Sequence, residues 1–151
     1  MSASAPQTYL VDTSALVRIL RRQVEPHWQD RVAAGHVWLC DPVATETMSI
    51  APAAQYDRFR QRLFETHPWV SVPEDPWPAV RDVQSRLARL GAHQCLSVAD
   101  HLVVATALRS GLTVLHADDD FVTAARAVPE LRQEKLPDPL VSYLDRPTTK
   151  A

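Results

Sequence analysis

Short apolar segments alternate with longer helix-like segments along this chain of 151 residues. The predicted strands are 8–11, 36–40, 69–72, 112–115 and, as an edge strand, 132–136. The predicted helices are 13–22, 26–34, a helix from Asp41 that ends before Pro52, 53–67, 78–90, 97–110 and 119–127. This order predicts an α/β fold, a three-layer α/β/α sandwich with a mostly parallel, roughly five-stranded sheet. In such sheets the functional site lies outside the carboxyl ends of the strands.

Composition limits the other classes of protein. The length is that of one domain, and we expect a single domain over 1–151 with its core at 8–136 and a loose proline-rich tail at 137–151. Sixteen basic against 18 acidic side chains give a net charge of −2, which excludes a strongly basic coat for nucleic acid but not a small RNA-binding patch. Cys40 and Cys95 are too few for a disulfide scaffold. Neither a targeting segment nor a membrane-length apolar run is visible, which favours a cytoplasmic protein.

Four acidic residues occupy positions that the predicted sheet brings together. Asp12 ends the first strand and Asp118 follows the fourth, so both are expected at the same edge of the sheet. Glu46 and Asp100 lie near the starts of helices whose N-termini can face that edge. Four carboxylates in one cleft repel one another strongly. A divalent cation relieves that repulsion, and Mg²⁺ or Mn²⁺ prefers oxygen ligands of this kind.

The same acids also fit a purely structural role. Asp12 and Asp118 are suitable N-caps for the helices that follow them, and Ser97 with Asp100 matches the capping-box pattern. Two observations weigh against capping alone. Glu46 lies inside its predicted helix, where no cap is needed, and Asp100 is flanked by apolar residues, although carboxylates are rarely buried without a partner or a metal.

Taken in order, these motifs resemble those of a known family. The run Asp-Thr-Ser at 12–14, the internal Glu46, SVADHLVVATAL at 97–108 and LHADDDF at 115–121 resemble the PIN-domain ribonucleases, in particular the VapC-type toxins of bacterial toxin–antitoxin modules. The resemblance covers roughly residues 8–136. Family members often carry an arginine shortly before the third acidic segment, whereas 91–96 contains none.

The resemblance implies an activity, a metal and partners. It implies a Mg²⁺-dependent endoribonuclease, with Mn²⁺ as a substitute, that leaves a 5′-phosphate by attack of metal-activated water. It further implies inhibition by a VapB-type antitoxin and a homodimer. Asp120 is our first choice for the group that orients or deprotonates the water, and Ser14 matches a hydroxyl of the site. The acids that match the metal-binding quartet of the family are Asp12, Glu46, Asp100 and Asp118.

Substrate contacts are predicted from cationic and aromatic side chains. Arg18, Arg21 and Arg22 stand at i, i+3 and i+4, so on one continuous helix they share a face that can hold RNA phosphates or simply be solvated. His116 lies beside the acids, but no histidine spacing matches a zinc motif. An exposed Trp28 or Trp77 would mark a groove for a partner.

Two other functions compete with the nuclease. An aspartate-based phosphotransfer domain, receiver-like or phosphatase-like, would use Asp12 as its nucleophile. The phosphatase pattern needs an aspartate where Ser14 stands, and a receiver needs a well-placed late lysine, for which only Lys135 and Lys150 are available. A non-catalytic binding module of the same fold is the other alternative, and the complete set of acids argues against it.

Overall fold

A parallel sheet forms the centre of the protein. We analysed a computed structural model, which describes residues 4–139. Its strands are β1 (Tyr9–Val11), β2 (Val37–Trp38), β3 (Thr113–His116) and β4 (Gln133–Lys135). The order is β2-β1-β3-β4, and every neighbouring pair is parallel. The predicted α/β sandwich is therefore confirmed, with four strands in place of roughly five.

The fifth predicted strand, 69–72, makes only an isolated bridge between Leu39 and Trp69. Leu39 donates to the carbonyl of Pro68 at 2.9 Å, and Val70 donates to the carbonyl of Leu39 at 2.9 Å. Pro68 and Pro73 bracket the segment. Pairing stops on one side because Pro68 has no N–H to donate, and on the other because the partner segment enters a helix at Asp41, so the expected strand is wrong.

The helices agree with the sequence expectations apart from their ends. The predicted helix 53–67 divides into a 3₁₀ turn (Ala53–Gln55) and α4. The expected N-cap of α3, Asp41, is wrong by one residue, because Cys40 is the N-cap and Asp41 is already helical. The helices are α1 (Thr13–Leu20), α2 (Pro26–Ala33), α3 (Asp41–Ser49), α4 (Tyr56–Thr66), α5 (Trp77–Arg89), α6 (Val98–Ser110) and α7 (Asp119–Ala127).

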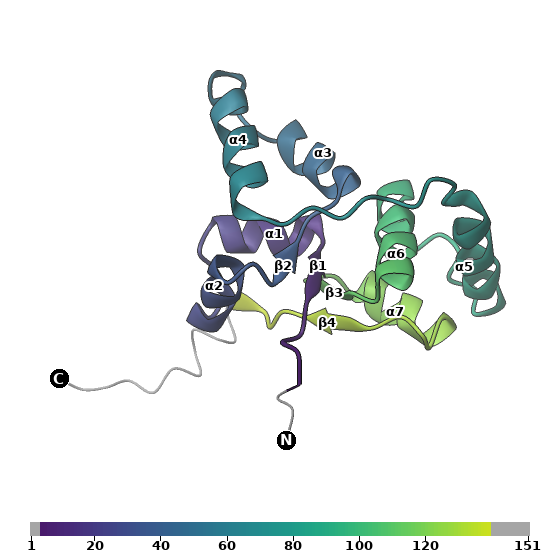
Figure 1. Cartoon of the computed structure of the whole chain (residues 1–151). Helices are drawn as coiled ribbons and strands as arrows, with labels where there is room; N and C mark the ends of the chain where they lie inside the picture. Colours follow the sequence, from purple (N-terminus) through teal and green to yellow (C-terminus); the bar gives the residue numbers. More distant parts are fainter. Residues whose placement is uncertain (1–3, 140–151) are drawn as a thin grey trace.

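The helices flank the sheet as Figure 1 shows. In that view α1 and α2 lie on one side, α5, α6 and α7 lie on the other, and α3 with α4 stands above. The core is apolar and closely packed, with Leu10, Leu115 and Phe121 fully buried. The helix α6 packs against α3, α5 and β3 and is buried mainly from His101 to Ala107, which fixes the helix whose first turn carries Asp100.

The structure describes the C-terminal segment only as far as residue 139. Most of the predicted loose tail, 140–151, lies outside the described residues. At its start the carbonyl of Pro137 accepts a hydrogen bond of 2.8 Å from Arg18. None of the helices within residues 4–139 combines the length and the apolar character needed to cross a bilayer.

Candidate metal centre

Asp12 is the buried member of an acidic cluster. It follows β1 directly, and its backbone N–H donates to the carbonyl of Leu115 at 2.9 Å, which holds it against β3. Its side chain Oδ2 accepts from the backbone N–H of Ser14 at 3.3 Å and from the hydroxyl of Ser14 at 2.9 Å. Its Oδ1 is buried and has no hydrogen-bond partner among the described residues. A buried carboxylate oxygen without a donor is costly, so this atom is available to a cation.

Glu46 extends from α3 toward Asp12, and it is exposed to solvent. The hydroxyl of Thr13 donates to its Oε1 at 2.8 Å, which orients the flexible side chain. Thr13 was not among the residues predicted from the sequence. The only sequence signal for Thr13 was its position between Asp12 and Ser14. Its contact with Glu46 depends on how closely α1 packs on α3, which the sequence does not show.

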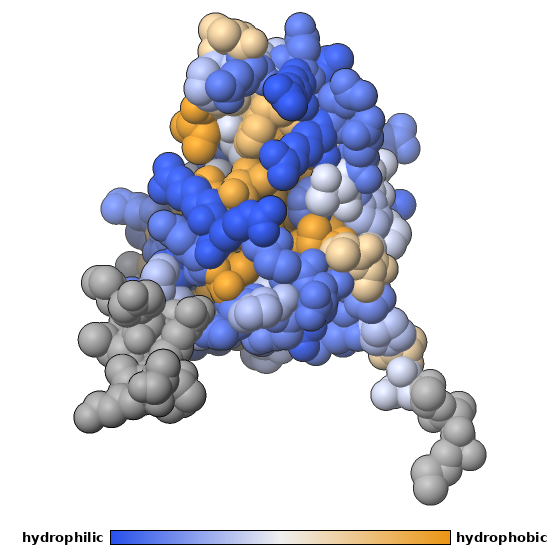
Figure 2. Space-filling view, turned by 90° about the vertical axis from the view of Figure 1, so that its left-hand side faces the viewer, coloured by the Kyte–Doolittle hydropathy of each residue, from blue (hydrophilic) through white to orange (hydrophobic). Residues whose placement is uncertain are grey.

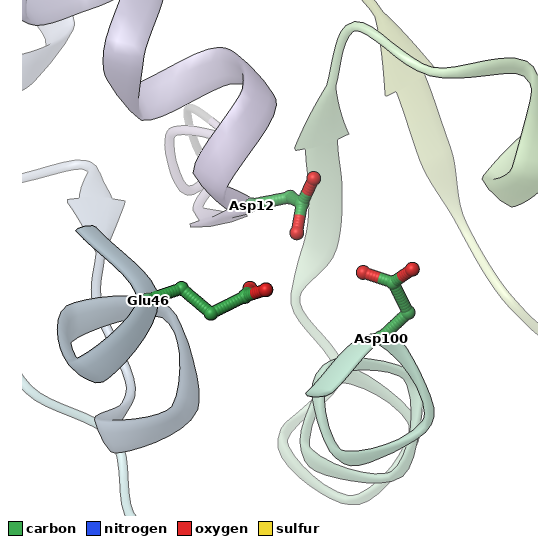
Figure 3. A group of neighbouring side chains, drawn as sticks. All are labelled: Asp12, Glu46 and Asp100. Atoms are coloured by element: carbon green, nitrogen blue, oxygen red, sulfur yellow. The ribbon is translucent and has the colours of Figure 1, made fainter. Parts of the chain in front are cut away.

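Asp100 comes from the first turn of α6 and completes the cluster. Ser97 and Asp100 form a reciprocal capping box, with N···O distances of 3.1 and 3.3 Å. Figure 3 shows the carboxylates of Asp12, Glu46 and Asp100 pointing toward one another from three separate elements. One oxygen from each lies within 4.8 Å of the other two. This geometry joins three of the four predicted ligands.

Burial and mutual repulsion disfavour the ionised forms of the acids in this cluster. Burial raises the pKa of Asp12 from 3.8 to about 6, and Asp100 adds to the rise, although the hydroxyl of Ser14 lowers it. Burial also raises the pKa of Asp100, with Glu46 and Asp118 contributing. Because the charged forms are disfavoured, a cation at this point gains from every carboxylate it contacts. Carboxylate oxygens alone, with the unpartnered Oδ1 of Asp12 among them, fit Mg²⁺ or Mn²⁺ better than a soft metal.

Asp118 and Asp120 lie beside the group of three rather than within it. Asp118 is the N-cap of α7, and its Oδ1 accepts from the backbone N–H of Asp120 at 3.0 Å. Burial raises the pKa of Asp120, and Asp118 and Asp100 add to the rise, so these acids share one negative rim. Asp118 stays a predicted fourth ligand and Asp120 a predicted base.

The capping and metal-site interpretations prove compatible. Asp12 caps α1, Asp118 caps α7, and Asp100 closes the capping box of α6. Three helix N-termini therefore point toward the acids, and the partial positive charge at each end offsets part of the carboxylate charge. The same side chains anchor the helices and line the cluster.

Ser14 and His116 brace the loop that carries Asp118. The hydroxyl of Ser14 accepts from the backbone N–H of Ala117 at 3.0 Å while it donates to Asp12. Nδ1 of His116 accepts from the backbone N–H of Asp118 at 3.1 Å, and its Nε2 lies 2.6 Å from Oε1 of Gln133. His116 is fully buried with both ring nitrogens engaged, so it packs between strands and is not a metal ligand.

The predicted arginine face loses one of its three members. The helix α1 ends at Leu20, Arg21 is its C-cap, and Arg22 has a left-handed φ of 56°. The expectation that Arg18, Arg21 and Arg22 share one helix face is therefore wrong for Arg22. Arg21 lines an apolar groove of about 210 Å³ between α1 and α4. Figure 2, which views the side of α1, α2 and α4, shows strongly hydrophilic side chains over apolar patches.

Of the two late lysines open to the phosphotransfer alternative, Lys135 is engaged elsewhere and Lys150 lies outside the described residues. Nζ of Lys135 lies 2.5 Å from Oδ1 of Asp119. The position two residues after Asp12 is Ser14, whose hydroxyl binds Asp12. Within residues 4–139, neither arrangement supplies the second acid or the free lysine that a phosphoaspartate site needs.

Comparison with known proteins agrees with this geometry. Residues 9–127 match the PIN domain. Ribonuclease VapC6 of Mycobacterium tuberculosis is 36% identical over 107 residues, which are 70% of this chain and 84% of that protein. Ribonuclease VapC2 of the same species is 35% identical over 120 residues, 76% of this chain and 83% of that protein. The chain belongs to the PIN-domain family, and its curated relatives are VapC proteins.

Solved structures share the fold at low sequence identity. A DNA-bound VapBC complex from Salmonella typhimurium matches with a TM-score of 0.65 at 15% identity, over 86% of this chain and 98% of that one. VapBC-1 from nontypeable Haemophilus influenzae matches with a TM-score of 0.67 at 13% identity, over 85% and 98%. The acidic cluster therefore stands in a fold that VapC proteins also adopt.

Proposed function

We propose that this chain is a single-domain, Mg²⁺-dependent endoribonuclease that acts as the toxin of a type II toxin–antitoxin module. The proposal is supported by relatives that are named ribonuclease VapC. The observation that carries it is the convergence of Asp12, Glu46 and Asp100, with a buried oxygen of Asp12 left without a protein partner.

Each acidic residue has a role in this proposal. Asp12, Glu46 and Asp100 hold the cation, and Asp118 joins them as the fourth carboxylate. Bound there, Mg²⁺ supplies a Lewis acid that lowers the pKa of water and offsets charge on the phosphate. Asp120, whose pKa burial raises above its ordinary value, accepts the proton of the attacking water. The new P–O bond forms as the bond to O3′ breaks, and the departing O3′ takes a proton from solvent water, which leaves a 5′-phosphate and a 3′-hydroxyl.

Cleavage of RNA is the direct test. Purified protein is incubated with single-stranded RNA in Mg²⁺, in Mn²⁺ and in excess EDTA, beside the variant Asp100→Asn. We expect wild-type cleavage only with a divalent cation and none with the variant, whose circular dichroism stays native. Full activity in EDTA or in Asp100→Asn would refute the assignment.

The proposal extends to partners. The similar solved structures are described as VapBC complexes, which supports a VapB-type antitoxin for this chain. We further propose a homodimer. Co-expression with a VapB-type protein is expected to give a stable complex without nuclease activity, and light scattering of the free toxin is expected to give twice the chain mass. Contacts of Arg18, Arg21 and Arg22 with RNA phosphates stay a prediction, tested by the salt dependence of RNA binding.

A further inference from the structure

An open groove of about 660 Å³ lies beside the acidic cluster. The first half of α3, the connection before α5 and the first turns of α5 and α6 form its walls. Trp77 is 47% exposed and Val98 is 67% exposed, and both line it. Large apolar side chains left in water at the rim of a site indicate a surface that a ligand covers.

The groove and the acidic cluster share a wall. Glu46 lines the groove, and a carboxylate oxygen of the same residue belongs to the group of three. Val98 and Ala99, on the opposite wall, directly precede Asp100. A nucleic-acid chain with one phosphate at the acids therefore brings a neighbouring nucleotide to the groove.

The charge and polarity of the residues that line the groove determine which part of the nucleotide it can receive. Asp41 and Glu46 contribute negative charge, and none of the described residues that line the groove is lysine, arginine or histidine. A phosphate is repelled by such a lining. A nucleobase is neutral and flat, and it stacks on aromatic side chains in single-stranded RNA recognition. The indole of Trp77 and the side chains of Val98 and Leu102 offer such an apolar surface.

We propose that this groove receives one unpaired RNA base adjacent to the scissile phosphate, and that the base stacks on Trp77. Trp77 is then a positioning and specificity-determining residue, while the acids carry the chemistry. The inference rests on the proposed nuclease function, since it places the base relative to a phosphate at the acidic cluster.

A cleavage assay with abasic substrates tests the stacking. The probe is a short single-stranded RNA that the wild-type protein cuts once, together with copies that lack the base on one side of the cut or on the other. For wild type we expect one abasic position to lower kcat/KM about 5- to 100-fold, mainly through KM. For Trp77→Ala we expect a similar loss on the intact RNA and no further loss at that abasic position.

Two variants control the experiment. Trp77→Phe retains an aromatic ring and is expected to restore most of the base dependence. Tyr56→Ala removes another partly exposed aromatic, 42% exposed and on α4, and is expected to behave as wild type. Circular dichroism and thermal melting show whether each variant is folded.

Several outcomes would overturn the proposal. Unchanged kcat/KM in folded Trp77→Ala, or an undiminished abasic effect in that variant, would refute base stacking while the nuclease function stands. Loss of a dimer on Trp77→Ala, seen by sedimentation velocity, would show that a second copy of the chain covers the groove. Absence of wild-type cleavage in both Mg²⁺ and Mn²⁺ would overturn the proposed function and this inference together.

Discussion

The hydroxyl of Thr13 donates a hydrogen bond of 2.8 Å to Oε1 of Glu46. Thr13, which directly follows Asp12, thus orients Glu46, which lies 33 positions further along the chain. Ser14, the next residue, does the same for Asp12. Two consecutive hydroxyl side chains therefore arrange two carboxylates that come from different elements.

Removal of the Thr13 hydroxyl is expected to weaken cation binding. Thr13→Val keeps the shape of the side chain but leaves Glu46 free to choose other rotamers. Because the contact is exposed, we expect a modest loss, about 3- to 10-fold in Mn²⁺ affinity by isothermal titration calorimetry, which is below the usual range for a buried hydrogen bond to a charged group. Thr13→Ser, which retains the hydroxyl, is expected to bind as wild type. Equal affinities for wild type and Thr13→Val would contradict the positioning role.

A bound cation is expected to stabilise the fold through Asp100. At Mn²⁺ about 100-fold above its Kd, linkage gives about 2.7 kcal/mol, or a rise in Tm of about 5–10 °C for a domain of this size. Asp100→Asn is expected to lose most of this rise in differential scanning fluorimetry. Asp57→Asn, on α4 and outside the cluster, is the matched control and retains it. A full rise in Asp100→Asn would remove Asp100 from the ligand set.

The burial of Asp12 predicts a particular pH dependence in the metal-free protein. Its folded pKa of about 6 lies above the unfolded value of 3.8, so the folded state binds the proton more tightly. Between about pH 4 and pH 6 the unfolded chain loses that proton first, and stability falls as pH rises. The total is roughly 3 kcal/mol, at about 1.4 kcal/mol for each pH unit by which a pKa moves.

Urea denaturation in a chelator measures this effect by comparison with Asp12→Asn. The variant carries no charge at this position, so its stability relative to wild type is expected to increase from pH 4 to pH 7. Groups that do not interact with Asp12 titrate in the same way in both proteins and cancel in the difference. A constant difference across this range would show that Asp12 ionises normally.

Ser14 is expected to contribute to stability in its own right. Its hydroxyl joins the backbone N–H of Ala117 to Asp12, and Ser14→Ala leaves that partly buried N–H unsatisfied. We expect a loss of about 1–3 kcal/mol in the free energy of unfolding. Ser49 is exposed near the end of α3, and its hydroxyl donates to the carbonyl of Thr45 in the preceding turn. Ser49→Ala is expected to change the free energy of unfolding by less than about 0.5 kcal/mol. Comparable losses in the two variants would refute a special role for Ser14.

The positions of the acids were predictable because they follow from local rules. The strand that ends at Asp12, the helix N-terminus at Asp100 and the internal position of Glu46 are each visible in a short window of sequence. A parallel sheet then brings these windows to one edge. Capping residues were equally visible, because the cap pattern depends on the identity of a few neighbours.

The errors arise where the answer depends on the packing of distant elements. Segment 69–72 has strand-like residues, but its distant partner segment enters α3 at Asp41 and Pro68 offers no N–H, so pairing stops after one bridge. The helix pattern continues through Arg22, yet the chain leaves the helix after Leu20 and turns toward α2. No residue of α1 indicates this turn in the sequence. The Thr13–Glu46 contact depends on the spacing of α1 and α3, and sequence periodicity does not determine that spacing.

The helix caps at Asp12 and Asp118 have an evolutionary consequence. Asparagine caps a helix about as well as aspartate does. A duplicated gene that exchanged these acids for their amides would therefore encode a well-folded protein with the charge of the site erased. Selection for folding alone does not favour aspartate over asparagine here, so we expect that only selection for the charge of the site preserves the carboxylates.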